Sequence, residues 1–150
     1  MTRPVAAYEE RLVAPVGWWV GVVGVAAVSA ATIHGGGSGL RAVVPYVVLV
    51  PAAVVVMLLL SRGRVVVEDG VLHVPGARIA LDHLGGVTPL DREGTRRVRG
   101  PLAEPRAYVA TRPWLSTSVR VQLEDPDDDT PYWLVGTRRP QDLAAVLATR

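Results

Sequence analysis

The chain has 150 residues, a formal net charge of +2 and 49% hydrophobic residues. At this length there is room for one ordinary domain, and any segment inside a membrane reduces that room. Cysteine is absent, which excludes disulfides, thiolate nucleophiles and thiolate metal ligands. Every basic residue is arginine, and lysine, asparagine and phenylalanine are also absent. This bias indicates a GC-rich genome rather than a function.

Two long uncharged runs lie near the N-terminus. Residues 12–33 carry no charge, and at about 1.5 Å per residue they reach roughly 30 Å, the thickness of a hydrocarbon core. A second run, residues 42–60, follows a short glycine-rich link. We therefore expect a membrane α-helical hairpin of two transmembrane helices over residues 12–61. Pro45 is expected in the first turn of the second helix, and Pro51 is expected to kink it.

The flanking sequence bears on how this hairpin is placed. Val28-Ser29-Ala30 loosely fits a signal-peptide cleavage site, but the apolar run is long for a signal peptide and a second run follows. Arginines are more frequent outside the hairpin than in its link: Arg3, Arg11, Arg62 and Arg64 flank it, and Arg41 lies in the link. Positive residues favour the cytoplasmic side, so this asymmetry predicts a multi-pass cell-membrane protein with both termini in the cytoplasm.

One side of the first run is lined by small residues. Gly17 and Gly21 have the G-x-x-x-G spacing and Gly24 follows, a pattern that allows close contact between membrane helices. The ordinary interpretation is packing against the second helix of the same chain. Self-association of two copies through this face is the alternative.

Residues 62–150 show a different pattern, in which short β-branched runs alternate with turn residues such as Asp69-Gly70. About seven strands are expected, at residues 64–68, 71–74, 77–80, 87–91, 108–110, 117–124 and 132–136. An amphipathic helix over residues 140–148 should close the chain, with Thr137 as a possible cap. Leu143 and Leu147, together with Val146, form its apolar side.

This layout predicts a small antiparallel β domain with a C-terminal helix, arranged as a pleckstrin-homology-like barrel that the helix plugs. A small β-sandwich or split barrel with a terminal helix is the competing fold. The chain is thus divided into a cytoplasmic N-terminal segment (residues 1–11), the transmembrane hairpin (12–61) and a cytoplasmic β-rich domain (62–150).

Three stretches resemble a known family. They are Tyr8-Glu9-Glu10-Arg11-Leu12, Arg112-Pro113-Trp114, and the run from Pro131-Tyr132-Trp133 through Thr137-Arg138-Arg139-Pro140. They resemble an actinobacterial membrane family catalogued as domain of unknown function 3093, over nearly the whole chain. The resemblance implies a two-helix membrane protein with a cytoplasmic β domain, and it implies no catalytic residue because the family has no established activity.

The sequence offers no set of residues for catalysis or for a cofactor. His34, His73 and His83 lack the close spacing of metal sites. The acidic run of residues 125–129 resembles the start of a calcium loop, but the glycine and the bidentate glutamate of such a loop are missing. The glycine-rich link follows an apolar helix rather than a strand, so it does not fit a phosphate-binding loop. We therefore predict no catalytic, cofactor or metal site and no enzyme activity.

Positive charge is concentrated between the fourth and fifth expected strands, in a stretch whose glycines and prolines predict a loop. A solvated loop is the ordinary interpretation, and contact with an anionic membrane leaflet is the functional one. Trp114 beside Arg112 adds a large ring that suits either core packing or partner binding. The candidate membrane or partner contacts are Arg96, Arg97, Arg99, Arg106, Arg112 and Trp114.

The leading hypothesis is a membrane-anchored interaction module that presents its β domain at the cytoplasmic face. Its expected partners are membrane lipids, a protein, or a second copy through the membrane helices. Nucleic acid is not expected, because the charge of the domain is balanced. The alternative is a subunit of a membrane enzyme or transport complex acting on a lipid or small solute, which Arg112, Trp114 and the Asp82–His83 pair would serve if they converged on one pocket.

Overall fold

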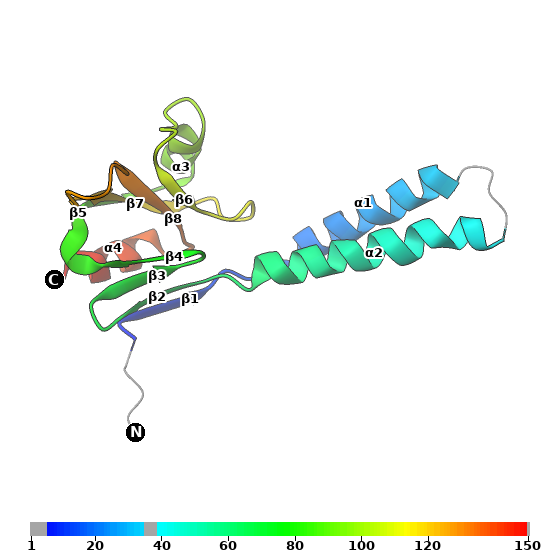
Figure 1. Cartoon of the computed structure of the whole chain (residues 1–150), viewed down its shortest axis with the longest axis horizontal. Helices are drawn as coiled ribbons and strands as arrows, with labels where there is room; N and C mark the ends of the chain where they lie inside the picture. The colour runs from blue at the N-terminus through cyan, green and yellow to red at the C-terminus, as the bar shows by residue number, and fades with distance from the viewer. Residues whose placement is uncertain (1–5, 35–38, 150) are drawn as a thin grey trace, which may run out of the picture. The chain divides into compact units, whose positions relative to one another are not determined.

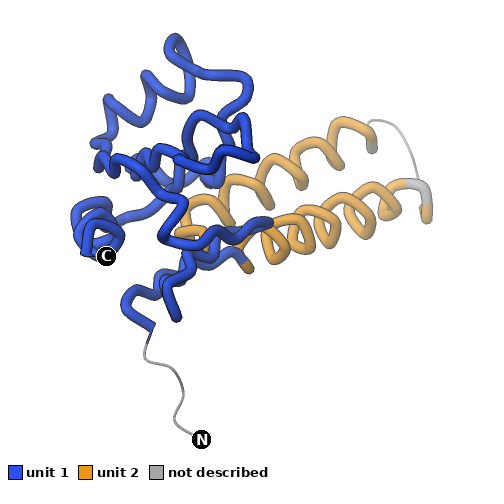
Figure 2. The backbone as a smooth tube through the Cα atoms, turned by 60° about the vertical axis from the view of Figure 1, so that its left-hand side comes forward, with its two compact units in different colours: residues 1–12, 63–150 blue, residues 13–62 orange. Residues whose placement is uncertain are grey.

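The computed structural model describes residues 6–34 and 39–149, which form two compact units (Figures 1 and 2). Residues 13–62 form one unit, called here the hairpin. The other unit, called here the β domain, combines residues up to Leu12 with residues from Gly63 onward. The β domain is therefore discontinuous in sequence, with the hairpin inserted after its first strand.

The hairpin consists of two antiparallel helices, α1 (Val16–His34) and α2 (Leu40–Ser61), that lie side by side in both views (Figures 1 and 2). Both are long and apolar enough to cross a membrane. Only 6% of each apolar window is buried, which is unlike the core helix of a soluble protein. Because α2 begins at Leu40, Pro45 lies beyond the first turn, contrary to the sequence-based expectation; the link of residues 35–38 lies outside the described residues.

The glycine face of α1 does not pack against α2. A Cβ atom built on Gly17, Gly21 or Gly24 would meet no heavy atom within 4 Å. Trp18, which is 40% exposed, lies on the same side of the helix, along an apolar groove lined by Gly17 and Gly21. Packing within the hairpin, the ordinary interpretation of this spacing, is thus wrong for these glycines. Self-association of two copies through this face, the alternative, stays a prediction.

The first sheet of the β domain contains four antiparallel strands in chain order. They are β1 (Tyr8–Arg11), β2 (Arg64–Glu68), β3 (Val71–Val74) and β4 (Ala77–Ala80). The backbone φ angle is positive at both central residues of the β2–β3 turn, 49° at Asp69 and 73° at Gly70. This is the conformation that an Asp-Gly hairpin turn favours. Strands β2 to β4 have the predicted bounds.

The second sheet has the order β5-β7-β8-β6 and follows a short 3₁₀ helix, η1 (Leu81–His83). Its strands are β5 (Leu84–Leu90), β6 (Tyr108–Ala110), β7 (Ser118–Leu123) and β8 (Tyr132–Gly136). Strand β8 lies between β6 and β7, and it is antiparallel to β7 but parallel to β6. Strands β6 and β7 run in opposite directions, so β8, which lies between them, can be antiparallel to only one of the two. The prediction of a purely antiparallel domain is therefore wrong at β6.

One apolar core is shared by both sheets and the C-terminal helix α4 (Pro140–Ala148), which packs against β5 and β7. The main core residues are Val65, Val67 and Leu72 from the first sheet, Val119, Val121 and Trp133 from the second, and Leu143 and Leu147 from α4. The predicted terminal helix and its apolar side are confirmed. Thr137 is not the cap residue, because the helix is preceded by Arg139, whose backbone N–H donates to the Thr137 hydroxyl at 3.0 Å.

The described strands form two separate sheets that are not closed into a barrel. A β domain with a C-terminal helix is thus confirmed, and the pleckstrin-homology-like barrel stays a prediction. Two sheets that share one core are closer to a β-sandwich, which was the competing prediction. The eighth strand, β1, was not expected, since residues 1–11 were assigned only to a terminal segment.

Candidate functional site

The arginine-rich stretch after β5 is a helix, α3 (Arg92–Arg99), rather than the predicted loop. Asp91 caps it, because its carboxylate accepts a hydrogen bond of 2.7 Å from the backbone N–H of Gly94. Three of its last four residues are arginines, which suits the negative end of the helix dipole. Gly94 and the prolines beyond the helix favour a loop in the sequence, although signals for the start and the end of a helix are present at Asp91 and Gly100.

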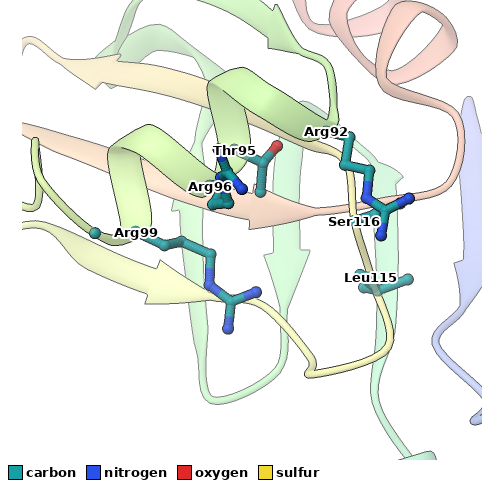
Figure 3. A pocket seen from close by; sticks show the side chains of 7 residues that line it. Arg92, Thr95, Arg96, Arg99, Leu115 and Ser116 are labelled. Atoms are coloured by element: carbon teal, nitrogen blue, oxygen red, sulfur yellow. The ribbon is translucent and has the colours of Figure 1, made fainter.

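A surface hollow of about 450 Å³ lies against α3 (Figure 3). Figure 3 shows the side chains of Arg92 and Arg99 leaving opposite ends of the helix, with Arg96 between them. The other side of the hollow comes from the segment that precedes β7, at Leu115 and Ser116. A volume of this size lies in the range of small-molecule sites, which is roughly 300 to 1,000 Å³.

The wall that α3 contributes is fixed by a buried pair of hydroxyl groups. Thr95 is 2% exposed and its hydroxyl lies 2.8 Å from that of Ser118, which is fully buried on β7. Thr95 also lines the hollow. Leu115, 3% exposed, belongs to the apolar core. The hollow is therefore built on two buried residues, Thr95 and Leu115, while its arginines, Gly100 and Ser116 are exposed.

The arginines of this region fall into two groups. Arg97 donates to Glu93 at 2.6 Å, and Arg106 lies 4.0 Å from Glu104. In contrast, no carboxylate of the described residues lies within ion-pair distance of Arg92, Arg96 or Arg99. The three arginines that line the hollow are thus those whose charge is not compensated by an ion pair.

Arg112 and Trp114, two further predicted contact residues, lie elsewhere. The Trp114 indole N–H donates to the backbone carbonyl of Leu12 at 3.2 Å, and the ring packs against the core. A Cβ atom on Gly63 would meet the Arg112 guanidinium at 3.1 Å. Trp114 therefore lies where the chain leaves the β domain and Arg112 lies beside Gly63, where the chain re-enters it. Neither side chain lines the hollow at α3.

The pair suggested for an enzyme site does not converge with them either. His83 lies 2.9 Å from Asp125, while the neighbouring Asp82 is exposed. The hydrogen bond with His83, helped by the backbone N–H of Asp127, lowers the pKa of Asp125 below its usual value. Across the described part of the chain, no three His, Asp or Glu side chains are grouped so as to hold a metal ion.

A second polar cluster, which sequence reasoning missed, is buried where β1 meets the junction of β8 and α4. Glu10 is 7% exposed, and its carboxylate accepts hydrogen bonds from the Tyr8 hydroxyl at 2.6 Å, from the Thr137 hydroxyl and from the backbone N–H of Arg138 at 3.0 Å. The Arg139 guanidinium lies over the Tyr8 ring, 4.9 Å from its centroid. This cluster joins the start of the described chain to its end.

The ionisation of this cluster follows from its surroundings. Burial alone would raise the pKa of Glu10, but the hydrogen bonds from Thr137, Tyr8 and Arg138 outweigh burial and lower that pKa below its usual value. Burial and the adjacent carboxylate raise the pKa of Tyr8 to about 12. Glu10 is therefore charged and Tyr8 neutral at pH 7, and together with Thr137 they form a structural unit within the fold.

A family model described as a protein of unknown function, DUF3093, matches residues 7–147. The chain belongs to the DUF3093 family. A search of curated proteins and a search of solved structures found no match.

The DUF3093 match includes both units of the chain. It begins one residue before β1, continues through the hairpin and ends in α4, at the fully buried Leu147. The family is thus defined over the apolar hairpin and the β domain together. The actinobacterial source that the resemblance implied stays a prediction.

Proposed function

We propose that the chain is an integral membrane protein whose hairpin anchors the β domain as an interaction module. The observation that carries this proposal is the insertion of two membrane-length helices between adjacent strands of one sheet. The family and the two long apolar helices support membrane association.

The pairing of β1 with β2 supports an even number of membrane crossings. Tyr8 is paired with Val67 and Arg11 with Arg64, on either side of the hairpin in sequence. Strands of one sheet must lie in the same compartment, so α1 and α2 must cross together and in opposite directions. The same pairing argues against signal-peptide cleavage at Ala30, because cleavage would remove a strand of the sheet.

The cytoplasmic face is the proposed side for the β domain. The two ends of the hairpin carry more arginine than its link, which favours cytoplasmic placement of both termini of the chain. On that side an anionic leaflet attracts basic surfaces, by about 1 kcal/mol per arginine close to the membrane. The arginines of α3 supply such a surface.

The proposed partners are membrane lipids or a protein with an acidic surface, and a second copy is proposed through the α1 face that bears Gly21. A pleckstrin-homology-like arrangement of the domain belongs to the same proposal. The alternative function, a subunit of an enzyme or transport complex acting on a lipid or small solute, is favoured by one observation, the ligand-sized hollow at α3.

Site-specific photo-crosslinking in native membranes tests this role. A photoreactive residue at Arg97, exposed on α3, should crosslink to a protein or to lipid, while the same group at Arg78, exposed on β4, should crosslink far less. Equal crosslinking at both positions, or a lone monomer at both, would refute the proposal that α3 carries the interaction.

A further inference from the structure

The three arginines of the hollow lie close together on one helix, where their like charges repel one another. Arg92 and Arg96 are four residues apart on α3, and Arg96 and Arg99 are three apart, so they are neighbours on the helix surface. Like charges at these spacings destabilise a helix. Arg97, one residue from Arg96, instead has the favourable pairing with Glu93. A bound anion would relieve the repulsion that the hollow concentrates.

The chemistry of the hollow indicates the kind of anion. A guanidinium group presents paired N–H donors that match the oxygens of a phosphate, and several guanidinium groups together suit a group with more than one negative charge. A phosphate monoester carries a charge of about −1.5 to −2 at pH 7, whereas a side-chain carboxylate carries only one. Three arginines without carboxylate partners therefore fit a phosphate monoester better than an acidic peptide.

The size and the wall of the hollow indicate an organic group attached to this phosphate. The space of about 450 Å³ is larger than a phosphate ion needs. Opposite α3 it is lined by Leu115, which is only 3% exposed, and by the exposed Ser116. A short polyol skeleton, which needs little apolar contact, suits this wall.

We propose that the hollow formed by Arg92, Arg96 and Arg99 on α3, with Leu115 and Ser116 opposite, binds the phosphate monoester of a small organic phosphate. The source is either a soluble compound or a phosphomonoester lipid headgroup, since both present the same group. This inference rests on the proposed function, because it names the ligand of the α3 surface that the membrane anchor presents.

The test uses the full chain in nanodiscs and measures protection of the α3 amides from hydrogen exchange. One arm adds glycerol 3-phosphate to discs of neutral phosphatidylcholine. The other arm compares discs containing phosphatidic acid, a phosphomonoester, with discs of equal surface charge made with phosphatidylglycerol, a phosphodiester. Protection by glycerol 3-phosphate identifies a soluble ligand, and protection by phosphatidic acid alone identifies a headgroup; either result supports the proposal.

Substitutions on the same helix provide the matched control. Arg96→Gln and Arg99→Gln should each weaken binding about tenfold, the usual effect of losing a hydrogen bond between charged groups. Arg97→Gln removes an equal charge from the same helix but from outside the hollow, and it should weaken binding less than Arg96→Gln or Arg99→Gln does, because Arg97 makes no direct contact with the ligand. Circular dichroism of each variant checks that α3 and the domain remain folded.

Two results would overturn the proposal. One is the absence of α3 protection with both glycerol 3-phosphate and phosphatidic acid. The other is an equal loss of binding in Arg97→Gln and Arg96→Gln, which would indicate diffuse attraction of anions to the helix. Neither result affects crosslinking from position 97, so a failure here is distinguishable from a failure of the proposed function.

Discussion

Glu10 is a buried carboxylate whose hydrogen bonds connect the first strand of the β domain to the turn between β8 and α4. A buried charge is tolerated only when its oxygens are well supplied with donors, and Tyr8, Thr137 and the backbone of Arg138 supply them. The cluster therefore stabilises the placement of β1 in the sheet as well as the end of β8.

Glu10→Gln should lower the free energy of unfolding by about 2 kcal/mol, because the hydrogen bonds to a charged acceptor are lost while the site stays buried. Chemical unfolding of the full chain in neutral detergent, followed by tryptophan fluorescence, measures the change. Glu9→Gln is the matched control, since the Glu9 side chain is exposed on the same strand, and it should change stability by less than about 0.5 kcal/mol. Equal effects of the two substitutions would contradict the structural role of the cluster.

The same cluster predicts how stability depends on pH. The folded state lowers the pKa of Glu10, so its contribution is present above the usual glutamate range and is lost as the pH falls through the lowered pKa. The folded state raises the pKa of Tyr8 from 10.0 to about 12, so that contribution is present below pH 10 and is lost as the pH rises towards 12. Stability measured against pH should therefore fall at both ends. Tyr8→Phe should remove the alkaline part, and an unchanged alkaline loss in that variant would assign it to another group.

Strand β1 determines whether the β domain can fold without the hairpin. Its pairing with β2 supplies one edge of the first sheet, and Leu12 on its C-terminal side is fully buried. The backbone N–H of Leu12 donates to the carbonyl of Gly63 at 2.9 Å, so the two ends of the domain segments are adjacent.

A fragment of residues 63–150 should therefore be unfolded or aggregated, whereas residues 6–12 joined to residue 63 through a short glycine linker should give a soluble folded domain. Solubility and the dispersion of amide NMR signals measure the difference. A well-folded fragment that lacks β1 would show that this strand is dispensable.

Capping by Asp91 is the local reason that α3 forms. Asp91→Ala should cost about 1 kcal/mol, the usual value for the loss of an N-terminal cap, and it should speed hydrogen exchange within α3 while α4 is unaffected. Asp82→Ala is a suitable control, because Asp82 is exposed and caps no long helix. A uniform effect on α3 and α4 would mean that the cap acts on the whole domain.

Sequence patterns predicted the elements that have a local signal. Strands β2 to β4 were predicted from β-branched runs separated by Asp-Gly and Pro-Gly turns, and α4 was predicted from apolar residues at helical spacing. Strand β1 was missed because it has four residues, three of them charged, and its partner lies beyond the whole hairpin. Helix α3 was missed because it has no apolar stripe, only Val98 and the buried Thr95.

The candidate site was predicted only in part. The sequence located the arginine-rich stretch, and Arg96 and Arg99 do line the hollow. It did not separate them from Arg97, which is paired, and it omitted Arg92 from the candidates, because helical spacing is not visible in a stretch taken for a loop. Trp114 was grouped with these arginines on composition, whereas its indole bonds to Leu12.

Two apolar helices separate β1 from β2, so membrane insertion of the hairpin and folding of the β domain are compatible only when both ends of the hairpin lie on one side of the bilayer. The pairing of β1 with β2 does not depend on arginine counts, which bear only on which side of the bilayer that is.

Labelling of single cysteines with a membrane-impermeant maleimide tests this claim most directly, because the natural chain has no cysteine. Cysteine is introduced at Glu9 before the hairpin, at Gly37 in its link, or at Asp127 in the β7–β8 loop. In cells whose wall has been removed but whose cell membrane is intact, we expect labelling at position 37 only. Positions 9 and 127 should be labelled after lysis. Different labelling of positions 9 and 127, or the same labelling of all three positions in intact cells, would contradict the account.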